Sequence, residues 1–475
     1  MDATQFYIGG EWVSPLGTDT MPIMDPAEDA RIGTVALGTA ADVDRAAEAA
    51  VAAFETFGRW RKAERLDLLR RIRAVTEVRR EDLAQAITRE MGAPIEMSRA
   101  MQAEAGIGHA DGFIEALEAQ EERWKLSNGD TLVREPIGPV GLITPWNWPI
   151  NQIALKVLPA LATGCPAILK PSEHTPLSAR IYAEILHEAG VPPGAFALVF
   201  GTGPEVGDAL ARHPALAMVS FTGSTRAGIS VTKSAADTVK RVTLELGGKS
   251  PNLVFADCGA ALEERVRASV AECFLNSGQS CDAPTRLIVE RACYDDAVEI
   301  ARDAAERTGV GDPRREGDHI GPLFDKLQWD RVQAMILTGI EEGARLVAGG
   351  PGRPSGLNQG WYARPTVFAD VSNDMQIARK EIFGPVLSIL PAADEAEAID
   401  IANDTEYGLA AYIQTGDAER AERVAARLRA GAVHVNGGGL GWGTPFGGYK
   451  ASGNGREGGL MGIEDYQEVK SLHFG

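Results

Sequence analysis

Residues 139–149 read PVGLITPWNWP, a short apolar run that leads into a turn built from proline and tryptophan. Similar runs follow it: AILK at 167–170, FALVF at 196–200, AMVSF at 217–221 and NLVF at 252–255. Most are separated by stretches long enough to hold a helix. This alternation predicts βαβ units, in which a parallel sheet carries helices on both faces. Ligands of such sheets bind beyond the carboxyl ends of the strands.

A second series of strand-like runs begins near residue 286. It comprises RLIVE at 286–290, TVFA at 366–369, VLSIL at 386–390 and AVHV at 432–435, with helical segments between them such as Asp394–Asn403. This series predicts a second α/β domain.

The first third of the chain is expected to be helical. Thr39 and Asp42 form a capping pair before an alanine-rich segment. Two apolar stripes repeat at helical spacing, namely Leu66, Leu69, Ile72 and Val75, then Leu83, Ile87 and Met91 before a stop at Gly92. Further on, Lys125–Arg134 contains the turn signal Asn128-Gly129, which predicts a hairpin that leaves the domain body.

The composition excludes several classes of protein. With 475 residues, of which 44% are apolar and 24% charged, the chain can bury a large core. Its net charge of -19 opposes binding to nucleic acid or to an anionic membrane. The start MDATQFYIGG lacks the features of a signal peptide, and no stretch offers about eighteen uninterrupted apolar residues, so we expect a soluble cytoplasmic protein.

Two glycine-rich segments follow predicted strands, at Gly201–Gly207 and Gly223–Gly228. Neither has the G-x-G-x-x-G spacing of a dinucleotide fingerprint. In the second segment, small residues near a helix start would let backbone N–H groups approach phosphate oxygens. A glycine after a strand is equally compatible with a simple turn, and the two interpretations remain open.

Cys281 ends the stretch FLNSGQSC, where small or polar neighbours leave its sulfur accessible. A nucleophilic role would need a thiolate, and therefore a positive local field or a nearby base. The other cysteines (Cys165, Cys258, Cys273 and Cys293) are interpreted as inert and reduced, because five scattered cysteines do not make a disulfide framework. No metal site is expected, since the chain has no CxxC or HExxH and its seven histidines are dispersed.

Two further polar residues are candidates for catalysis. Glu245 lies between two leucines in LELGG, and a carboxyl group in apolar surroundings has a raised pKa that suits a general base. Asn147 in PWNWP would offer a rigid N–H donor to a developing oxyanion. Taken singly, a partnered carboxylate and a turn asparagine explain these residues as well.

Taken together and in this order, these segments resemble the aldehyde dehydrogenase superfamily from about residue 5 to the C-terminus. The motifs are PWNWP (145–149), LKPSE (169–173), FTGSTRAG (221–228), LELGGKSPN (244–252), the N-x-G-Q-x-C run ending at Cys281, EIFGPV (381–386) and PFGGYKASGNGRE (445–457). The resemblance implies Cys281 as the nucleophile, Glu245 as the general base, and Asn147 as an oxyanion donor together with the backbone N–H of Cys281.

The resemblance also implies a cofactor site for NAD. Lys170 and Glu173 would hold the adenosine ribose, Ser224 the pyrophosphate, and Glu381 and Phe383 the nicotinamide ribose and ring. Other matching positions are Thr144, Trp146, Ser172 and Gly223 at the cofactor cleft and Lys156 in support of the site. Glu173 would repel a 2′-phosphate, so NAD is favoured and NADP is the weaker alternative.

The implied reaction oxidises an aldehyde to its carboxylic acid through a cysteine hemithioacetal and thioester, with hydride transfer to NAD and hydrolysis assisted by Glu245. Members that transfer the acyl group to coenzyme A typically lack this glutamate. The alternatives are a coenzyme A-acylating semialdehyde dehydrogenase and a catalytically silent structural member of the family.

Departures from the common pattern lie near the substrate. Trp148 replaces the usual phenylalanine, Asp282 follows the nucleophile directly, and residues 437–444 are rich in glycine. They suggest a tunnel opened by Gly437–Gly439 and narrowed by Trp148, Trp442 and Phe446, which would take a medium-chain or aromatic aldehyde or semialdehyde.

The implied fold has two doubly wound, Rossmann-like α/β domains and a small β extension. Residues 1–117 and 137–247 would form the NAD-binding domain and 248–447 the catalytic domain. Residues 118–136 and 448–475 would form an oligomerisation hairpin and tail that extend a neighbouring subunit's sheet in a homodimer or homotetramer.

Overall fold

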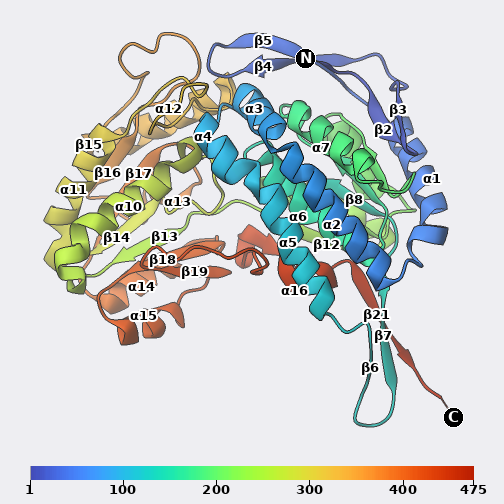
Figure 1. Ribbon diagram of the computed structural model, residues 1–475. Helices are drawn as coiled ribbons and strands as arrows, with labels where there is room; N and C mark the ends of the chain where they lie inside the picture. The colour runs from blue at the N-terminus through green and yellow to red at the C-terminus, as the bar shows by residue number, and fades with distance from the viewer. Residues whose placement is uncertain (1, 475) are drawn as a thin grey trace.

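The computed structural model describes residues 2–474, which form two large sheets, each with helices packed on it (Figure 1). The first sheet has the strand order β20-β12-β11-β8-β9-β10-β2-β3, and neighbouring strands from β12 to β10 run parallel. Its strands are β20 (Gly453–Asn454), β12 (Arg241–Glu245), β11 (Met218–Thr222), β8 (Val140–Ile143), β9 (Ala167–Lys170), β10 (Phe196–Leu198), β2 (Phe6–Ile8) and β3 (Glu11–Val13).

The strand order reverses between β8 and β11. The chain passes from β8 to β9 and β10 on one side, then returns to β11 and β12 on the other side of β8. The connections hold α6 (Pro149–Thr163), α7 (Pro176–Glu188), α8 (Asp208–Arg212) and α9 (Thr225–Ala235). Because ligands of doubly wound sheets bind at such a reversal, the carboxyl ends of β8 and β11 are the expected place for a site.

The second sheet has the order β15-β16-β17-β14-β13-β18-β19, parallel except for β15. Its strands are β15 (Arg345–Ala348), β16 (Thr366–Ala369), β17 (Val386–Ala392), β14 (Arg286–Glu290), β13 (Pro251–Val254), β18 (Ala410–Gln414) and β19 (Ala432–Val435). Its helices are α10 (Leu262–Phe274), α11 (Tyr294–Arg307), α12 (Lys326–Glu341), α13 (Gln376–Arg379), α14 (Glu395–Asn403) and α15 (Ala418–Ala425). The run at 252–255, which follows the first series along the sequence, therefore belongs to the second sheet as β13.

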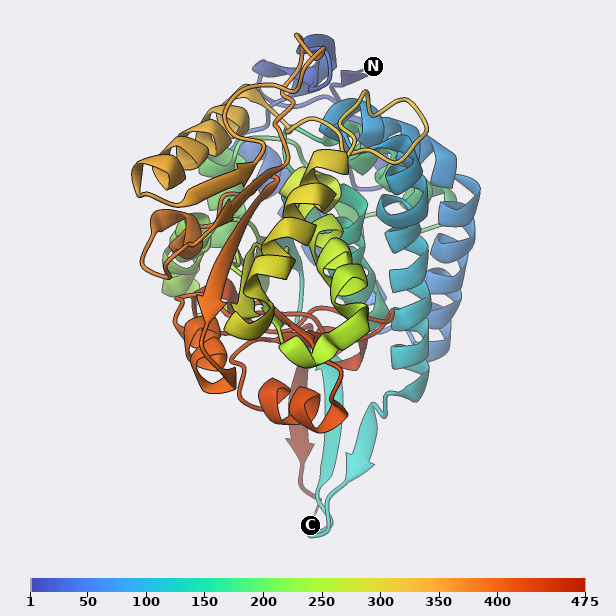
Figure 2. The same cartoon turned by 90° about the vertical axis from the view of Figure 1, so that its left-hand side faces the viewer.

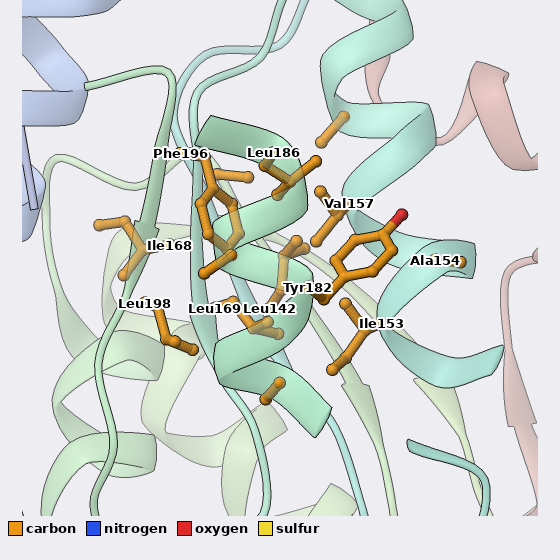
Figure 3. Packing of buried hydrophobic residues seen from close by; sticks show 14 of the residues in the cluster. Leu142, Ile153, Ala154, Val157, Ile168, Leu169, Tyr182, Leu186, Phe196 and Leu198 are labelled. Carbon is orange, nitrogen blue, oxygen red and sulfur yellow. The ribbon is translucent and has the colours of Figure 1, made fainter. Parts of the chain in front are cut away.

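The predicted N-terminal helices are confirmed as α1 (Ala40–Phe57), α2 (Lys62–Val78) and α3 (Arg80–Met91), followed by α4 (Ile95–Met97) and α5 (Glu104–Ala119). The backbone N–H of Thr39 donates to Asp42 Oδ2 at 2.9 Å, which caps α1. Helix α3 ends at Gly92, whose φ of 86° is the left-handed value that glycine adopts without strain. Figure 3 shows the core, where side chains of α6 and α7 meet those of β8, β9 and β10.

The predicted hairpin is confirmed and projects from the body of the molecule (Figures 1 and 2). It consists of β6 (Arg123–Lys125) and β7 (Thr131–Pro136), and β21 (Gln467–Leu472) pairs antiparallel with β7. The expected tail at 448–475 is shorter than predicted, because β20 is an edge strand of the first sheet and α16 (Gly459–Glu464) packs against α5 and α6. Helix α16 buries Ile463 in the first core, which holds this segment to the body.

Near the N-terminus, β1 (Asp2–Ala3), β5 (Ala30–Ala36) and β4 (Thr20–Asp25) make a small separate sheet. Within residues 2–474, no helix combines the length and the apolar character needed to cross a membrane.

A buried carboxyl group joins α3 to the start of α7, and its removal is expected to destabilise the fold. Glu90 is 1% exposed and accepts hydrogen bonds from the backbone N–H groups of Leu177 and Ser178 at 2.6 and 2.9 Å. Glu90→Ala leaves these donors unpaired in the core, which should lower the free energy of unfolding by about 2 kcal/mol. The check is the thermal midpoint of the variant beside that of Glu48→Ala, an exposed control in α1.

The sign of the pH dependence follows from the pKa. Burial raises the pKa of Glu90 to about 7, so its contribution to stability is full below the pKa of the unfolded chain and declines as pH rises towards 7. The drop in melting temperature should therefore be larger at pH 5 than at pH 8. A midpoint equal to that of the Glu48→Ala control at pH 5 would contradict this role.

Candidate active site

A cavity of about 600 Å³ lies at the reversal of strand order between β8 and β11. Trp146 and Asn147 follow β8, Gly223 and Ser224 follow β11, and Glu245 ends β12. The second sheet contributes residues that precede its strands, since Cys281 comes before β14 and Glu381 before β17. The carboxyl ends of the first sheet therefore face the amino ends of the second, and the rule about carboxyl ends holds for the first sheet alone.

The cavity brings together most, but not all, of the predicted site residues. Its lining includes Trp146, Asn147, Gly223, Ser224, Glu245, Cys281, Glu381 and Phe383. Thr144, Lys170, Ser172 and Glu173 are not among the lining residues, although His174 next to Glu173 is. Trp148, Trp442 and Phe446 do not line it either.

The nucleophile loop, residues 275–281, has an unusual backbone. Asn276 and Ser277 adopt left-handed conformations with φ of 53° and 58°. A Cβ at Gly278 would lie 2.1 Å from the carbonyl oxygen of Gly384, so only glycine fits there. This close approach brings the loop that ends at Cys281 against the segment that carries Glu381 and Phe383.

The thiol of Cys281 lies in an electronegative environment. Burial raises the pKa of Cys281 well above its ordinary value, and the nearby carboxyl groups of Asp282, Glu381 and Glu245 raise it further. The positive field expected around a reactive thiol is thus replaced by acidic neighbours. Deprotonation must then rely on a base, or on positive charge that arrives with a ligand.

Glu245 is suited to act as that base or to activate water. It is 4% exposed, and within the described chain neither carboxyl oxygen has a hydrogen-bond partner. Burial raises its pKa well above the ordinary value, Glu457 raises it further, and Lys156 lowers it. Lys156 forms a buried ion pair with Glu457 and donates to Ser220 Oγ at 2.9 Å. Glu457 ends the motif PFGGYKASGNGRE (445–457), but no sequence signal assigned it a role.

Asn147 is fixed at both its backbone and its side chain. Its Nδ2 donates to the carbonyl oxygen of Gln279 at 3.0 Å. Its own carbonyl oxygen accepts from Gln102 Nε2 at 3.1 Å and from Asn276 Nδ2 at 2.9 Å. The bond to Gln279 uses one N–H of the amide, which leaves the second to a ligand of the cavity that Asn147 and Cys281 both line.

Ser224 and Thr222 at the cavity, together with Lys170 and Glu173 outside its lining, have the chemistry of an anion and sugar site. Ser224 is the N-cap of α9, and its Oγ accepts from the N–H of Ala227 at 3.3 Å. The hydroxyl oxygen of Thr222 is buried without a partner in residues 2–474. Lys170 Nζ pairs with Glu173 Oε2 at 2.7 Å. Burial raises the pKa of Glu173, but the charge and hydrogen bond of Lys170 lower it, and the net pKa lies below the ordinary value. A helix start for phosphates and an ionised carboxylate for ribose hydroxyls fit a dinucleotide.

Aromatic side chains form a flat wall of the same cavity. The ring of Trp146 stacks on that of Phe324 at 4.0 Å and meets Phe383 edge to face at 5.5 Å. Phe383 has a φ of 58°, a strained value for a bulky residue. The residues that the sequence did not indicate come mainly from α12 and the segment before it: Phe324, Gln328, Arg331 and Met335. Asp325 signals a helix start, but no pattern indicated that this helix faces the cavity.

The residues predicted to narrow a substrate tunnel have different contact partners. Trp148 Nε1 donates to Ser280 Oγ at 2.7 Å, next to the nucleophile. Trp442 is 50% exposed and its ring centre lies 4.9 Å from that of His109 on α5. The backbone of Phe446 pairs with that of Glu457. Gly437–Gly439 and Asp282, which follows Cys281 directly, line a second cavity of about 600 Å³. The tunnel itself stays a prediction.

Comparisons with known proteins agree with this geometry. The model of the aldehyde dehydrogenase family matches residues 12–472. The chain is 50% identical over 474 residues to 3-succinoylsemialdehyde-pyridine dehydrogenase of a Pseudomonas species, covering 99% of this chain and 98% of the relative.

Solved structures give the same result. Aldehyde dehydrogenase C of Pseudomonas syringae, a cysteine-to-alanine variant in complex with NAD+ and octanal, is 49% identical with a TM-score of 0.97, covering 99% of this chain and 96% of that one. Betaine aldehyde dehydrogenase of Staphylococcus aureus in complex with NAD+ is 34% identical with a TM-score of 0.95, covering 99% and 94%. By its sequence, its fold and the residues gathered in its cavity, the chain belongs to the aldehyde dehydrogenase family.

Proposed function

We propose that the chain oxidises an aldehyde to its carboxylic acid with NAD, through a thioester on Cys281 that is hydrolysed with the help of Glu245. The observation that carries the proposal is that one cavity is lined by a candidate nucleophile, a fixed amide donor and a buried carboxyl group without a hydrogen-bond partner in residues 2–474. A catalytically silent member of the family would lack one of these three groups.

The residues divide the chemistry between them. The thiol proton of Cys281 passes to Glu245 and on to solvent, and the thiolate sulfur bonds to the aldehyde carbon. The carbonyl oxygen becomes an oxyanion held by the free N–H of Asn147 and the backbone N–H of Cys281. NAD, when bound, would supply a positively charged ring and an acceptor for the hydride that the adduct loses on becoming a thioester. Glu245 takes a proton from water, whose oxygen bonds to the acyl carbon as the Cys281 sulfur leaves.

Hydrolysis is favoured over transfer of the acyl group to coenzyme A. The carboxyl group of Glu245 lines the same cavity as the sulfur that would carry the acyl group. Its raised pKa places its proton uptake closer to neutral pH than that of an ordinary glutamate. A coenzyme A-dependent reaction would leave this buried carboxyl group without a use.

NAD is the proposed cofactor and NADP the weaker alternative. The ionised Glu173 would accept a hydrogen bond from a ribose 2′-hydroxyl and repel a 2′-phosphate. Support comes from relatives with solved structures in complex with NAD+.

The proposed substrate is a medium-chain or aromatic aldehyde or semialdehyde. Two relatives near 50% identity support it, one named for a pyridine semialdehyde and one bound to octanal. Trp148 beside the nucleophile loop offers an apolar wall for such a chain or ring.

We also propose the assembly and the location of the protein. The sheet β21-β7-β6 has open edges at β21 and β6, which suit pairing with a second subunit in a homodimer or homotetramer. Five free cysteines favour the reducing cytoplasm. The first sheet would form the NAD-binding domain and the second the catalytic domain.

The first test is the formation of NADH, followed at 340 nm, with aliphatic, aromatic and semialdehyde substrates. Wild type and Cys281→Ala are compared with NAD or NADP, each with and without coenzyme A. We expect turnover that requires Cys281, is independent of coenzyme A and is higher in kcat/KM with NAD. Turnover that needs coenzyme A would overturn hydrolysis, and a strong preference for betaine aldehyde or glyceraldehyde 3-phosphate would overturn the substrate class.

The pH dependence of kcat tests Glu245 as the base. A base acts only when deprotonated, so kcat of the wild type should rise with pH as the buried carboxyl group loses its proton, at a pH above the ordinary glutamate pKa. Glu245→Gln should lower kcat by about 10²–10⁴-fold and remove this rise. The same pH profile in both proteins would exclude Glu245 from the rate-limiting step.

A further inference from the structure

The side chain of Asn276 is placed where an unpaired oxygen is unfavourable. It is 3% exposed and its Oδ1 is buried without a hydrogen-bond partner among the residues described. A buried, unpaired amide oxygen opposes folding, and the left-handed backbone adds strain. The role of the Asn276 side chain is therefore sought in the contacts of its amide nitrogen, Nδ2.

The Nδ2 of Asn276 contacts two backbone carbonyls that control Asn147. It donates to the carbonyl oxygen of Asn147 at 2.9 Å and lies 3.4 Å from that of Gln279. The carbonyl of Gln279 also accepts the side-chain amide of Asn147 at 3.0 Å. The backbone and the side chain of Asn147 are therefore both hydrogen-bonded to the nucleophile loop. Asn276 Nδ2 contacts the carbonyl oxygen at each of these two hydrogen bonds.

The loop is also tied to the aromatic wall of the cavity, but through a different side chain. Gln279 Oε1 accepts from the N–H of Phe324 at 2.9 Å, and Phe324 stacks on Trp146. Gln279 Nε2 donates to the carbonyl of Asn276 at 3.1 Å. The side chain of Asn276 thus contacts Asn147, the oxyanion donor, whereas Gln279 is hydrogen-bonded both to Asn147 and to Phe324 in the wall of the cavity.

We propose that Asn276 is a positioning residue, which holds the Asn147 amide so that its free N–H points at the oxyanion formed on Cys281. The inference rests on the proposed function, because it assigns a task only if Asn147 stabilises that oxyanion. Asn276 touches neither substrate nor cofactor and acts through Asn147.

A double-mutant cycle tests the proposal, with Asn276→Asp, Asn147→Ala and the double variant. Asn276→Asp keeps the shape of the side chain but places an oxygen against the two carbonyls. Asn147→Ala should lower kcat by about 10²–10³-fold, as loss of one oxyanion donor does, and Asn276→Asp by about tenfold or more. The KM for NAD should stay unchanged for Asn276→Asp, since Phe324 keeps its contact with Gln279.

The double variant separates positioning from a general loss of structure. If Asn276 acts through Asn147, adding Asn276→Asp to Asn147→Ala should cause less than about a threefold further loss. The introduced carboxyl group should also recover donor function when protonated, so the deficit of Asn276→Asp should shrink as pH falls. The matched control is Ser277→Ala, which removes a buried bond from Oγ to the Gly321 carbonyl at 2.8 Å in the same loop.

The outcomes decide the proposal. Multiplicative losses in the double variant, or a deficit of Ser277→Ala equal to that of Asn276→Asp at every pH, would overturn it. The cycle is repeated with hydrolysis of p-nitrophenyl acetate, which uses the Cys281 oxyanion without aldehyde or NAD. If no aldehyde is oxidised but the double-mutant cycle with the ester shows coupling, the proposed function fails and the role of Asn276 stands. If aldehydes are oxidised but neither cycle shows coupling, the proposed function stands and the role of Asn276 fails.

Discussion

The short crossover from β12 to β13 is the constraint on which the site depends. Glu245 ends β12 in the first sheet and Pro251 begins β13 in the second, so only residues 246–250 separate these two strands. A Cβ at Gly247 would lie 2.4 Å from Glu381 Oε2, and one at Gly248 would lie 2.3 Å from the carbonyl oxygen of Cys281. Two glycines at the crossover therefore let the segments that carry the nucleophile and Glu381 approach the end of β12. Any side chain at these positions would push Glu381 and Cys281 away from the end of β12.

The same closeness determines the electrostatics of the cavity. Burial raises the pKa of Cys281, of Glu245 and of Glu381, the last to about 7, and the carboxyl groups of Glu381 and Glu245 raise the pKa of Cys281 further. Near neutral pH these groups therefore hold or exchange protons rather than carry fixed charges. Such a site suits a reaction in which a thiol must lose a proton and a carboxyl group must later accept one. The buried pair of Lys156 and Glu457 sets the local field at Glu245.

Much of the fold could be predicted because it depends on local patterns. Apolar runs such as 167–170 and the capping pair Thr39–Asp42 show their structure in a few neighbouring residues, and both were confirmed. The pattern of apolar runs could not assign β13 to the second sheet, since only pairing with β14 and β18 places it there, whereas the family resemblance put residues 248–447 together. The extent of the tail failed for a similar reason, because β20 joins β12 through contacts distant in sequence.

The chemical groups of the site were predictable and their surroundings were not. Cys281, Glu245 and Asn147 stand in motifs whose order is specific, and the cavity brings all three together. The wall formed by α12 and the ion partner Glu457 depend on the packing of distant segments, which spacing in the sequence does not determine.

The most direct measurement of the central claim is the intact mass of Glu245→Gln after mixing with aldehyde and NAD. If Cys281 carries the acyl group and Glu245 drives its hydrolysis, this variant should accumulate a covalent adduct of the acyl mass on the peptide that contains Cys281. An unmodified Cys281 in a variant that still forms NADH at the wild-type rate would contradict the thioester route and the role of Glu245.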